Sequence, residues 1–533
     1  MKKEQQFDED VDSRVEENEA GQPSAAAPPL KALIRIEKGE IARAVDEAEA
    51  ALVAVASTAP ILARAGMLVM PIIDRLPAAH GRMTNIALLK PLTTANVIYL
   101  LNKHAAVFEQ YDGRNKKWVI VDPPSTVATQ LLEKGQWQFP KVSGVITTPT
   151  LRPDGTVLDK PGYDPSTQLW FMPDNGLSLP ASVKNPTQKE ASRALALLES
   201  LLINFPFVDA VDHAVALAAM LTPILRGAFD VTPMYMFRAH EVGSGKSFLA
   251  DLISAIASGQ PCPVISHVES IAEMEKRLGA LLLEGAPFIS LDNCSCDIGG
   301  DLLCQITERR TVRIRILGKS EAPKCEWRGV VYGTGNNITY TGDMVRRGMT
   351  TNLDARVERP ELREFDFDPI ERVMQDRGAY IAAALTVARA YITAGSPVVC
   401  RPLGSYGEWS ATVRSPLVWL GKEDPVKSMD MTREEDPGRI AYQTLITLWR
   451  DLIGIDVGLT AADLVGLVDC NSSKLTDLRA LLLQQAGTPR GEISTRSVGK
   501  WLMASHGRVH NGLRIARVKE NSTHEHKYAL REN

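Results

Sequence analysis

The sequence of 533 residues has no uninterrupted apolar run of the length that a membrane span requires. The longest apolar stretch, at 50–73, is broken by Pro60, Arg64 and Pro71, whereas a spanning helix needs about 20 consecutive apolar residues. The N-terminus begins Met-Lys-Lys and then turns acidic, without the apolar core of a secretory signal. We therefore expect a cytoplasmic protein with no membrane partner.

The chain also lacks a net positive charge and a paired cysteine pattern. Its formal charge of -4 and pI near 6.2 exclude a globally basic nucleic-acid coat, so any contact with DNA must come from local basic surfaces. Seven cysteines are scattered along the chain, and the only close pair, Cys294 and Cys296, has no second pair at zinc-ligand spacing. This pattern indicates reduced thiols.

Composition and periodicity divide the chain into five segments. The acidic residues of the first segment, mixed with Ser, Ala and Pro, cannot bury enough apolar surface to order it. A helix-compatible stretch follows at 31–56. Beyond it, short apolar runs are broken by turn residues, and over 188–225 apolar residues recur at helical spacing. We expect a disordered acidic tail (1–30), an N-terminal α+β domain (31–185), a helical linker or collar (186–230), an α/β core with a lid (231–400), and a C-terminal helical and winged-helix-like domain (401–533).

The predicted core alternates strands with helices. Strands are expected at 233–237, 287–291 and 329–332, with helices at 247–258 and 271–283. This alternation is typical of a three-layer α/β fold, in which helices cover both faces of a mostly parallel sheet.

The loop after the first of these strands reads His-Glu-Val-Gly-Ser-Gly-Lys-Ser and predicts a P-loop ATPase. A phosphate loop needs glycines for close backbone approach, a lysine for phosphate charge and a hydroxyl for Mg²⁺. The matching residues are Gly243, Ser244, Gly245, Lys246 and Ser247. His240 stands at the first position of the motif in place of Gly, so the strict pattern is not matched.

The next predicted strand ends in Asp292, where a P-loop fold places its second Mg²⁺-directing group. Many such enzymes have an acid at the following position to polarise the attacking water, but here it is Asn293. Either Asn293 orients the water while Glu273, Glu275 or Glu308 supplies the carboxylate, or hydrolysis is slow.

Two further polar groups complete the predicted site. The strand at 329–332 leads into Gly335-Asn336-Asn337, and an amide at that end can contact the γ-phosphate or the attacking water; Asn336 is the first choice, although Gly-Asn-Asn is also a good turn. Arg346 and Arg347 follow, and one of them is a candidate arginine finger that completes a neighbouring subunit's site; the alternative is a solvated pair on a helix.

Apolar and basic residues alternate from Thr311 to Arg328 around Gly318, which predicts a β-hairpin with a charged tip. Directed into the central channel of a ring, such a tip would hold DNA phosphates; otherwise its charges lie on an exposed strand face. The candidate DNA-binding residues are Lys319, Lys324, Arg313 and Arg315.

Helical patterns at 439–453, 475–485 and 495–504 precede a predicted strand pair at 512–518 and 527–530. The last forty residues are locally basic, and a helix followed by a two-stranded ribbon is the outline of a winged helix. Such a domain binds either DNA or protein.

Taken in order, the phosphate loop, Asp292-Asn293, the hairpin, Gly335-Asn336-Asn337 and Arg346-Arg347 resemble the superfamily 3 type AAA+ replicative helicases of phages, prophages and other mobile genetic elements. The resemblance covers roughly residues 140–533. It implies a P-loop AAA+ core, ATP and Mg²⁺ as cofactors, and a homo-oligomeric ring, expected as a hexamer, that moves along single-stranded or forked DNA. Residues 1–230 contain no recognisable primase site, so priming would need a separate primase or replication initiator.

The leading hypothesis is therefore an ATP-dependent DNA helicase for replication of a mobile element. Two rivals remain open at this point. One is an ATP-switched origin-binding initiator or helicase loader with slow hydrolysis, which Asn293 favours. The other is a defence ATPase with a related core.

Overall fold

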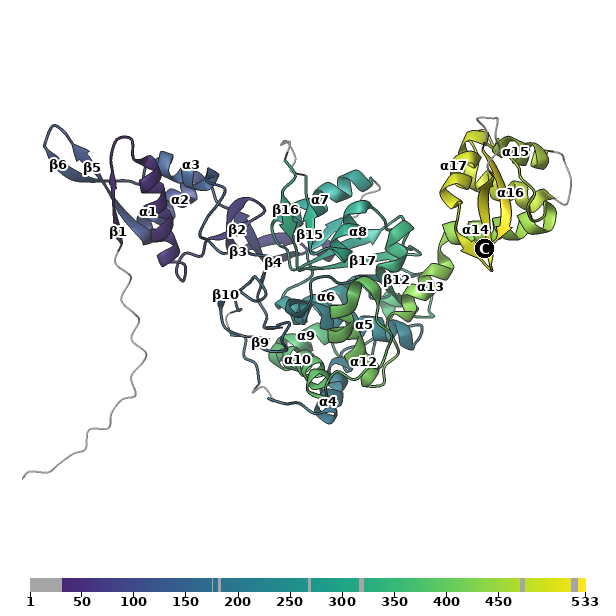
Figure 1. The fold of residues 1–533 in the computed structure, drawn as a ribbon. Helices are drawn as coiled ribbons and strands as arrows, with labels where there is room; N and C mark the ends of the chain where they lie inside the picture. The colour runs from purple at the N-terminus through teal and green to yellow at the C-terminus, as the bar shows by residue number, and fades with distance from the viewer. Residues whose placement is uncertain are drawn as a thin grey trace, which may run out of the picture. The chain divides into compact units, whose positions relative to one another are not determined.

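A computed structural model describes residues 31–174, 176–180, 184–266, 270–315, 321–469, 475–518 and 526–533 (Figure 1). The predicted acidic tail, 1–30, lies outside these residues. The chain forms two compact units: the first comprises the residues up to Ala59 together with Thr94–Lys134, and the second comprises Pro60–Thr93 together with Gly135–Asn533. The segment 31–185, predicted as one domain, is thus divided between both units.

The first unit is an α+β structure built on a three-stranded sheet in the order β1-β5-β6. The expectation of a helix throughout 31–56 is wrong at its start, because Ala32–Ile36 forms β1 and pairs in parallel with β5; the helix α1 begins only at Ile41. The elements of this unit are β1 (Ala32–Ile36), α1 (Ile41–Ala54), α2 (Thr94–Leu100), β5 (Ala106–Asp112), β6 (Lys117–Val121) and α3 (Ser125–Glu133).

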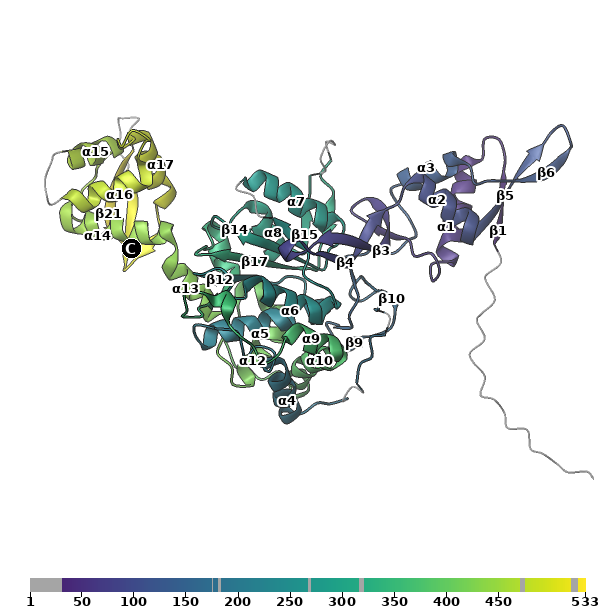
Figure 2. The same cartoon turned by 180° about the vertical axis from the view of Figure 1, so that it is seen from behind.

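A five-stranded, entirely parallel sheet forms the centre of the second unit, in the order β13-β14-β17-β12-β18. In Figures 1 and 2, α7 and α8 lie on one side of this sheet, and α5 and α6 lie on the other. This mixed α/β arrangement with a parallel sheet agrees with the sequence-based expectation. The elements are α5 (Ala210–Ile224), β12 (Met234–Ala239), α6 (Lys246–Ser258), β13 (Val264–Ser266), α7 (Ile271–Leu283), β14 (Phe288–Cys294), α8 (Asp301–Glu308), β17 (Val330–Asn336) and β18 (Gly348–Leu353).

The strand order determines which polar residues meet. The carboxyl ends of parallel strands lie at one edge of a sheet, and ligands bind outside that edge in open α/β folds. Because β17 lies between β14 and β12, Asn336 at the end of β17 is flanked by Asp292 of β14 and by the loop that follows β12. The three predicted motifs therefore share one edge.

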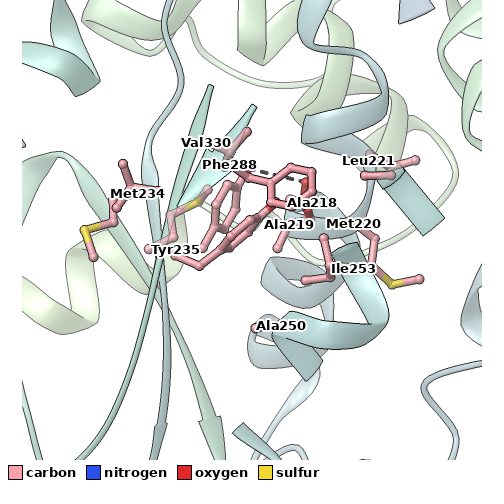
Figure 3. Packing of buried hydrophobic residues seen from close by; sticks show 14 of the residues in the cluster. Ala218, Ala219, Met220, Leu221, Met234, Tyr235, Ala250, Ile253, Phe288 and Val330 are labelled. Carbon is pink, nitrogen blue, oxygen red and sulfur yellow. Dashed lines mark hydrogen bonds between the residues drawn. The ribbon is translucent and has the colours of Figure 1, made fainter. Parts of the chain in front are cut away.

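Large apolar side chains hold α5 and α6 against the sheet (Figure 3). The buried Tyr235 and Tyr332 lie on neighbouring strands in register, and their hydroxyls reach Thr222 and the Ala219 carbonyl of α5, at 2.5 and 3.2 Å. Full burial of an apolar side chain in this core, such as Phe237 or Ile253, contributes roughly 1.5–3 kcal/mol. Since Leu249, Leu252 and Ile253 of α6 belong to the same core, the start of α6 is held firmly against the end of β12.

Smaller sheets and additional helices complete the second unit. An antiparallel sheet β2-β3-β4, the short sheet β10-β11-β7 and the pair β8-β9 precede the central sheet, and β15 pairs with β16 as an antiparallel hairpin. Their bounds are β2 (Leu62–Arg64), β3 (Met67–Pro77), β4 (Met83–Pro91), β7 (Gly144–Ile146), β8 (Thr150–Leu151), β9 (Val157–Leu158), β10 (Gly162–Asp164), β11 (Leu169–Phe171), β15 (Thr311–Arg313) and β16 (Lys324–Glu326). The additional helices are α4 (Gln188–Glu199), α9 (Pro369–Gln375), α10 (Arg377–Thr393), α11 (Gly407–Trp409), α12 (Ser415–Trp419) and α13 (Lys427–Glu435).

The C-terminal residues have a hydrophobic cluster of their own, centred on the fully buried Trp449, Leu482 and Leu502. Helices at three predicted positions and an antiparallel sheet β19-β20-β21 contribute to it. Whether this part acts as a winged helix stays a prediction. Its elements are α14 (Pro437–Leu452), α15 (Ala461–Asp469), α16 (Thr476–Ala486), α17 (Thr495–Ser505), β19 (Val509–His510), β20 (Leu513–Val518) and β21 (Lys527–Glu532).

Two absences hold for the part of the chain that the structure describes. None of its helices combines the length and the apolar character that a membrane crossing would need. It also contains no cluster of three or more His, Cys, Asp or Glu side chains arranged to hold a metal ion, and none of the six cysteines within it forms a disulfide bond.

Candidate nucleotide-binding site

The predicted phosphate loop joins the carboxyl end of β12 to the first turn of α6. Gly243 and Gly245 adopt φ angles of +81° and +97°, a region that residues with a Cβ rarely enter. Ser244 between them is buried and donates a hydrogen bond to the Glu241 carbonyl at 2.7 Å. The helix begins at Lys246, so its unpaired N-terminal backbone N–H groups lie next to the loop, where the helix dipole favours an anion.

Gly243 cannot gain a side chain without a change in the loop. A Cβ at this position would lie 3.1 Å from the Cβ and the backbone nitrogen of Glu361. For Gly243→Ala we expect the folded core to persist and ATP affinity to fall about tenfold, because an L-residue in this conformation costs roughly 1–2 kcal/mol. Fluorescent-nucleotide titration of Gly243→Ala against Val242→Ala, which truncates an exposed side chain of the same loop, measures the effect. Equal affinities for the two variants would contradict the assigned role of the loop.

Asp292 is the centre of a hydrogen-bond cluster at the edge of the sheet. Its Oδ1 accepts hydrogen bonds from the hydroxyls of Ser247, at 3.1 Å, and of Thr334, at 2.8 Å. Its Oδ2 accepts no hydrogen bond from any residue that the structure describes. The two residues predicted to direct Mg²⁺, Ser247 and Asp292, are thus in direct contact, and one carboxylate oxygen is left available.

Thr334 was not identified from the sequence. It is fully enclosed on β17, donates to Asp292, and accepts a hydrogen bond at 2.9 Å from the backbone N–H of Asn293. The sequence offered one indication of this role, a hydroxyl between Gly333 and Gly335 inside an otherwise apolar strand. The contact with Asp292, however, depends on the pairing of β17 with β14. Thr334 therefore positions both residues that follow Leu291.

The structure distinguishes between the two candidate sensor amides. The Oδ1 of Asn336 is buried and has no hydrogen-bond partner among the described residues. Asn337 instead turns back, at a φ of +50°, and its Oδ1 contacts Nδ1 of His240 at 2.5 Å. The residue that departs from the phosphate-loop pattern thus engages Asn337, and the unpartnered Asn336 is the amide that remains for a ligand.

Lys246 lies half-buried at the start of α6. Its Nζ donates a hydrogen bond to the Glu241 carbonyl at 3.1 Å. Burial lowers the pKa of this ammonium, and the negative charges of Asp292 and Glu241 oppose that shift. A phosphate at the loop would supply the counter-charge that a partly desolvated lysine lacks.

None of the carboxylates considered as an alternative base contacts Asp292 or Asn293 among the described residues. Glu273 pairs with Lys276 and Arg277, and Glu275 accepts the backbone N–H of Leu302 at 3.0 Å. Glu308 pairs with Arg347 and accepts a hydrogen bond from Ser405. Asn293 itself is exposed and adopts a left-handed conformation, with φ at +51°.

The two candidate finger arginines have different environments. Arg347 is almost fully buried and forms ion pairs with Glu308 and Asp343, so it is committed to contacts within the chain. Arg346 has 51% of its side chain exposed and, among the described residues, forms an ion pair with Asp343 alone. The hydrogen bond from Arg346, together with Arg347, lowers the pKa of Asp343 to about 2. Of the two, only Arg346 is accessible to another subunit.

The predicted hairpin is present as β15 and β16, with Arg313 directly opposite Lys324. Both side chains are exposed, as is that of Arg315 just beyond β15. Lys319 and the tip of the hairpin lie outside the described residues.

A cavity of about 480 Å³ adjoins the phosphate loop and was not predicted from the sequence. It is bounded by Gly243, Ser244 and Gly245 on one side and by aromatic side chains on the other. Its size and largely apolar lining are typical of a small-molecule site. The aromatic and cationic residues that line it are Phe205, Phe248, Phe365, Phe367 and Arg363.

Comparisons with known proteins found similarities among solved structures. No family model matches the sequence, and no curated protein matches it. Two solved structures of the apo A form of the NrS-1 C-terminal region align at 12% identity: one covers 78% of this chain and 91% of that chain with a TM-score of 0.37, and the other covers 86% and 96% with a TM-score of 0.36. A structure of JCV helicase with a bound small molecule aligns at 11% identity over 48% of this chain and 71% of that chain, with a TM-score of 0.19. At such TM-scores these similarities carry no conclusion about activity.

Proposed function

We propose that this chain is an ATP- and Mg²⁺-dependent DNA helicase or translocase that works as a homo-oligomeric ring, expected to be a hexamer, in replication of a mobile genetic element. One observation carries the nucleotide-dependent part of the proposal. Ser247 and Thr334 both donate to Asp292 beside a loop in which Gly243 and Gly245 have positive φ angles. The resemblance of the ordered motifs to superfamily 3 helicases supports the DNA-dependent part.

The residues present suit a nucleoside triphosphate with Mg²⁺. The backbone N–H groups of the loop and the Lys246 ammonium would bind the phosphates, and the aromatic cavity next to Gly245 would take the nucleoside. The hydroxyl of Ser247, the free oxygen of Asp292 and the unpartnered Oδ1 of Asn336 are oxygen donors, which Mg²⁺ prefers. When bound, Mg²⁺ would neutralise charge on the phosphates.

Two features support the proposed contacts with a neighbouring subunit and with DNA. The exposed Arg346 is available to reach a neighbour's nucleotide, while Asn336 would report on the γ-phosphate within its own subunit. The exposed Arg313, Arg315 and Lys324 provide cations for DNA phosphates. Primer synthesis would come from a separate primase.

Unwinding of a forked DNA by the purified full chain tests this proposal. We expect ATP-dependent strand separation that is lost in Lys246→Ala, because that variant lacks the charge that binds the phosphates. The control is Lys189→Ala, which removes an exposed lysine on α4. An inactive wild type, or a Lys246→Ala variant that unwinds as well as the wild type, would reject the helicase function.

A second function, an ATP-switched initiator or helicase loader with slow hydrolysis, is favoured by one observation. The position after Asp292 carries an amide, and Glu273, Glu275 and Glu308 are all engaged elsewhere. An initiator would bind a particular duplex sequence tightly and turn over ATP slowly. A helicase would instead show ATP turnover that rises strongly with single-stranded DNA.

A further inference from the structure

A large groove in the second unit carries an excess of positive charge that neither the nucleotide site nor the ion pairs of the fold explain. The groove has a volume of about 960 Å³ and lies between residues 135–142, the end of α8 and the base of the β15–β16 hairpin. Five cationic side chains line it, against one carboxylate, that of Glu326. The cations are Arg64, Lys141, Arg309, Arg313 and Lys324.

Among the described residues, only one of these five cations has hydrogen-bond partners for its charged group. Arg64 is buried beneath the groove, where it donates to the carbonyls of Val142, Ser143, Leu282 and Leu283 at 2.6–3.1 Å. It thereby joins the segment that carries Lys141 to the end of α7. Within the described residues, the exposed Lys141, Arg309, Arg313 and Lys324 form no ion pair.

The carboxylate of Glu326 does not offset these charges. It accepts hydrogen bonds from Arg310 at 3.2 Å and from Ser143 at 3.0 Å, so it is already neutralised by a cation outside the lining. In addition, Arg313 lies directly opposite Lys324 across the hairpin, and like charges at such a pair destabilise a sheet. An anionic ligand would remove this repulsion.

The lining indicates which anion fits. Small-molecule sites are mostly apolar with a few polar groups, whereas exposed cations line this groove from residues 135–142, from the end of α8 and from the hairpin. Spaced cations suit a polyanion with regularly spaced charges. The indole of Trp137 and the amides of Gln136 and Gln305 also line the groove, and they suit the faces and edges of unpaired bases, which a duplex hides.

We infer that this groove binds single-stranded nucleic acid, with Lys141, Arg309, Arg313 and Lys324 on its phosphates. Lys141 and Arg309 extend the nucleic-acid contact well beyond the hairpin. The inference deepens the proposed function, since it places a strand along the base of the hairpin as well as at its tip.

The test is the affinity of the full chain for a fluorescent oligothymidine, measured by anisotropy without nucleotide at several salt concentrations. We expect Lys141→Ala/Arg309→Ala to weaken binding at least tenfold. The slope of log K against log salt should fall by about 1.4, since each single-strand phosphate contact contributes about 0.7. The matched control, Lys189→Ala/Arg193→Ala, removes two exposed cations of α4, outside the groove. If both double variants bind alike, the groove is not the site.

Two further measurements test whether the groove prefers single strands and whether the weaker binding of the variant has a cause other than loss of the groove contacts. Duplex DNA that displaces the oligothymidine more effectively than unlabelled oligothymidine would overturn the single-strand assignment. Thermal unfolding and ATP affinity of the groove variant should match the wild type, because both replaced side chains are exposed and distant in sequence from the phosphate loop. Because no nucleotide is present, the result stands even if the chain proves to have no helicase activity.

Discussion

Replacing Arg346 by alanine should lower the ATPase kcat by roughly 10³–10⁵-fold, the range that an arginine finger contributes. ATP affinity should change little, because Arg346 is exposed and belongs to no contact around the phosphate loop. Within the described part of the chain, its guanidinium contacts Asp343 alone, and an exposed ion pair of this kind is released at little cost. Steady-state turnover and nucleotide titration on the same preparation give the two quantities.

Mixing two inactive variants shows whether Arg346 acts on a neighbour. An Arg346→Ala subunit keeps a complete phosphate loop, and a Lys246→Ala subunit keeps its arginine. In a mixed ring, the second would complete the site of the first, so we expect activity to reappear on mixing. A mixture no more active than its separate components would place Arg346 outside the neighbouring site.

Arg347 serves as the matched control for the finger. Its removal leaves Glu308 and Asp343 without their buried partner, so Arg347→Ala should lower the free energy of unfolding by about 2 kcal/mol. Arg346→Ala should leave stability close to that of the wild type. The reverse pattern would contradict the roles proposed for the two arginines.

The sequence predicted the parallel sheet because its strands are buried on both faces and read as apolar runs that end in polar residues. The strand at 233–237, the helix at 247–258 and the strand at 287–291 correspond to β12, α6 and β14, with boundaries shifted by a few residues. Where a short strand pairs with a distant one, the prediction failed. Ala32–Ile36 suited a helix locally, but its pairing with Ala106–Gln110 made it a strand.

For the candidate site, the identities of most residues could be predicted and their contacts could not. Gly243, Gly245 and Ser247 follow from a local motif, whereas the role of Thr334 depends on the pairing of two strands whose contacting residues are 42 positions apart in the sequence. Arg346 and Arg347 are indistinguishable as neighbours in the sequence. Burial separates them, and burial is a property of the tertiary structure.

The aromatic cavity and the basic groove depend even more on long-range contacts. Phe205, Phe248 and Phe365 are far apart in the chain and meet only at the phosphate loop. Lys141 and Arg309 are separated in the sequence by more than the length of a small domain. Arg64 holds part of the groove together, because it donates hydrogen bonds to the backbone carbonyls of Val142 and Leu282. No periodicity in the sequence indicates that these distant residues lie together in the fold.

Replacing Asp292 by asparagine should nearly abolish ATP hydrolysis while preserving the fold. The amide has almost the same shape, and its oxygen can still accept hydrogen bonds from Ser247 and Thr334, so the edge of the sheet should keep its geometry. The negative charge available for Mg²⁺ is lost. A loss of about 4 kcal/mol of transition-state stabilisation corresponds to roughly 10³-fold in kcat.

The dependence on Mg²⁺ separates this effect from general damage. We expect Asp292→Asn to bind ATP in the absence of Mg²⁺ as the wild type does, and to lose most of the gain in affinity that Mg²⁺ provides to the wild type. Asn293→Ala is the control, because the exposed side chain of Asn293 makes no hydrogen bond with any residue that the structure describes, and the contact with Thr334 comes from its backbone. If the magnesium dependence of Asp292→Asn equals that of the wild type, the cation is held by other residues, and the oxygen of Asn336 is the next to replace.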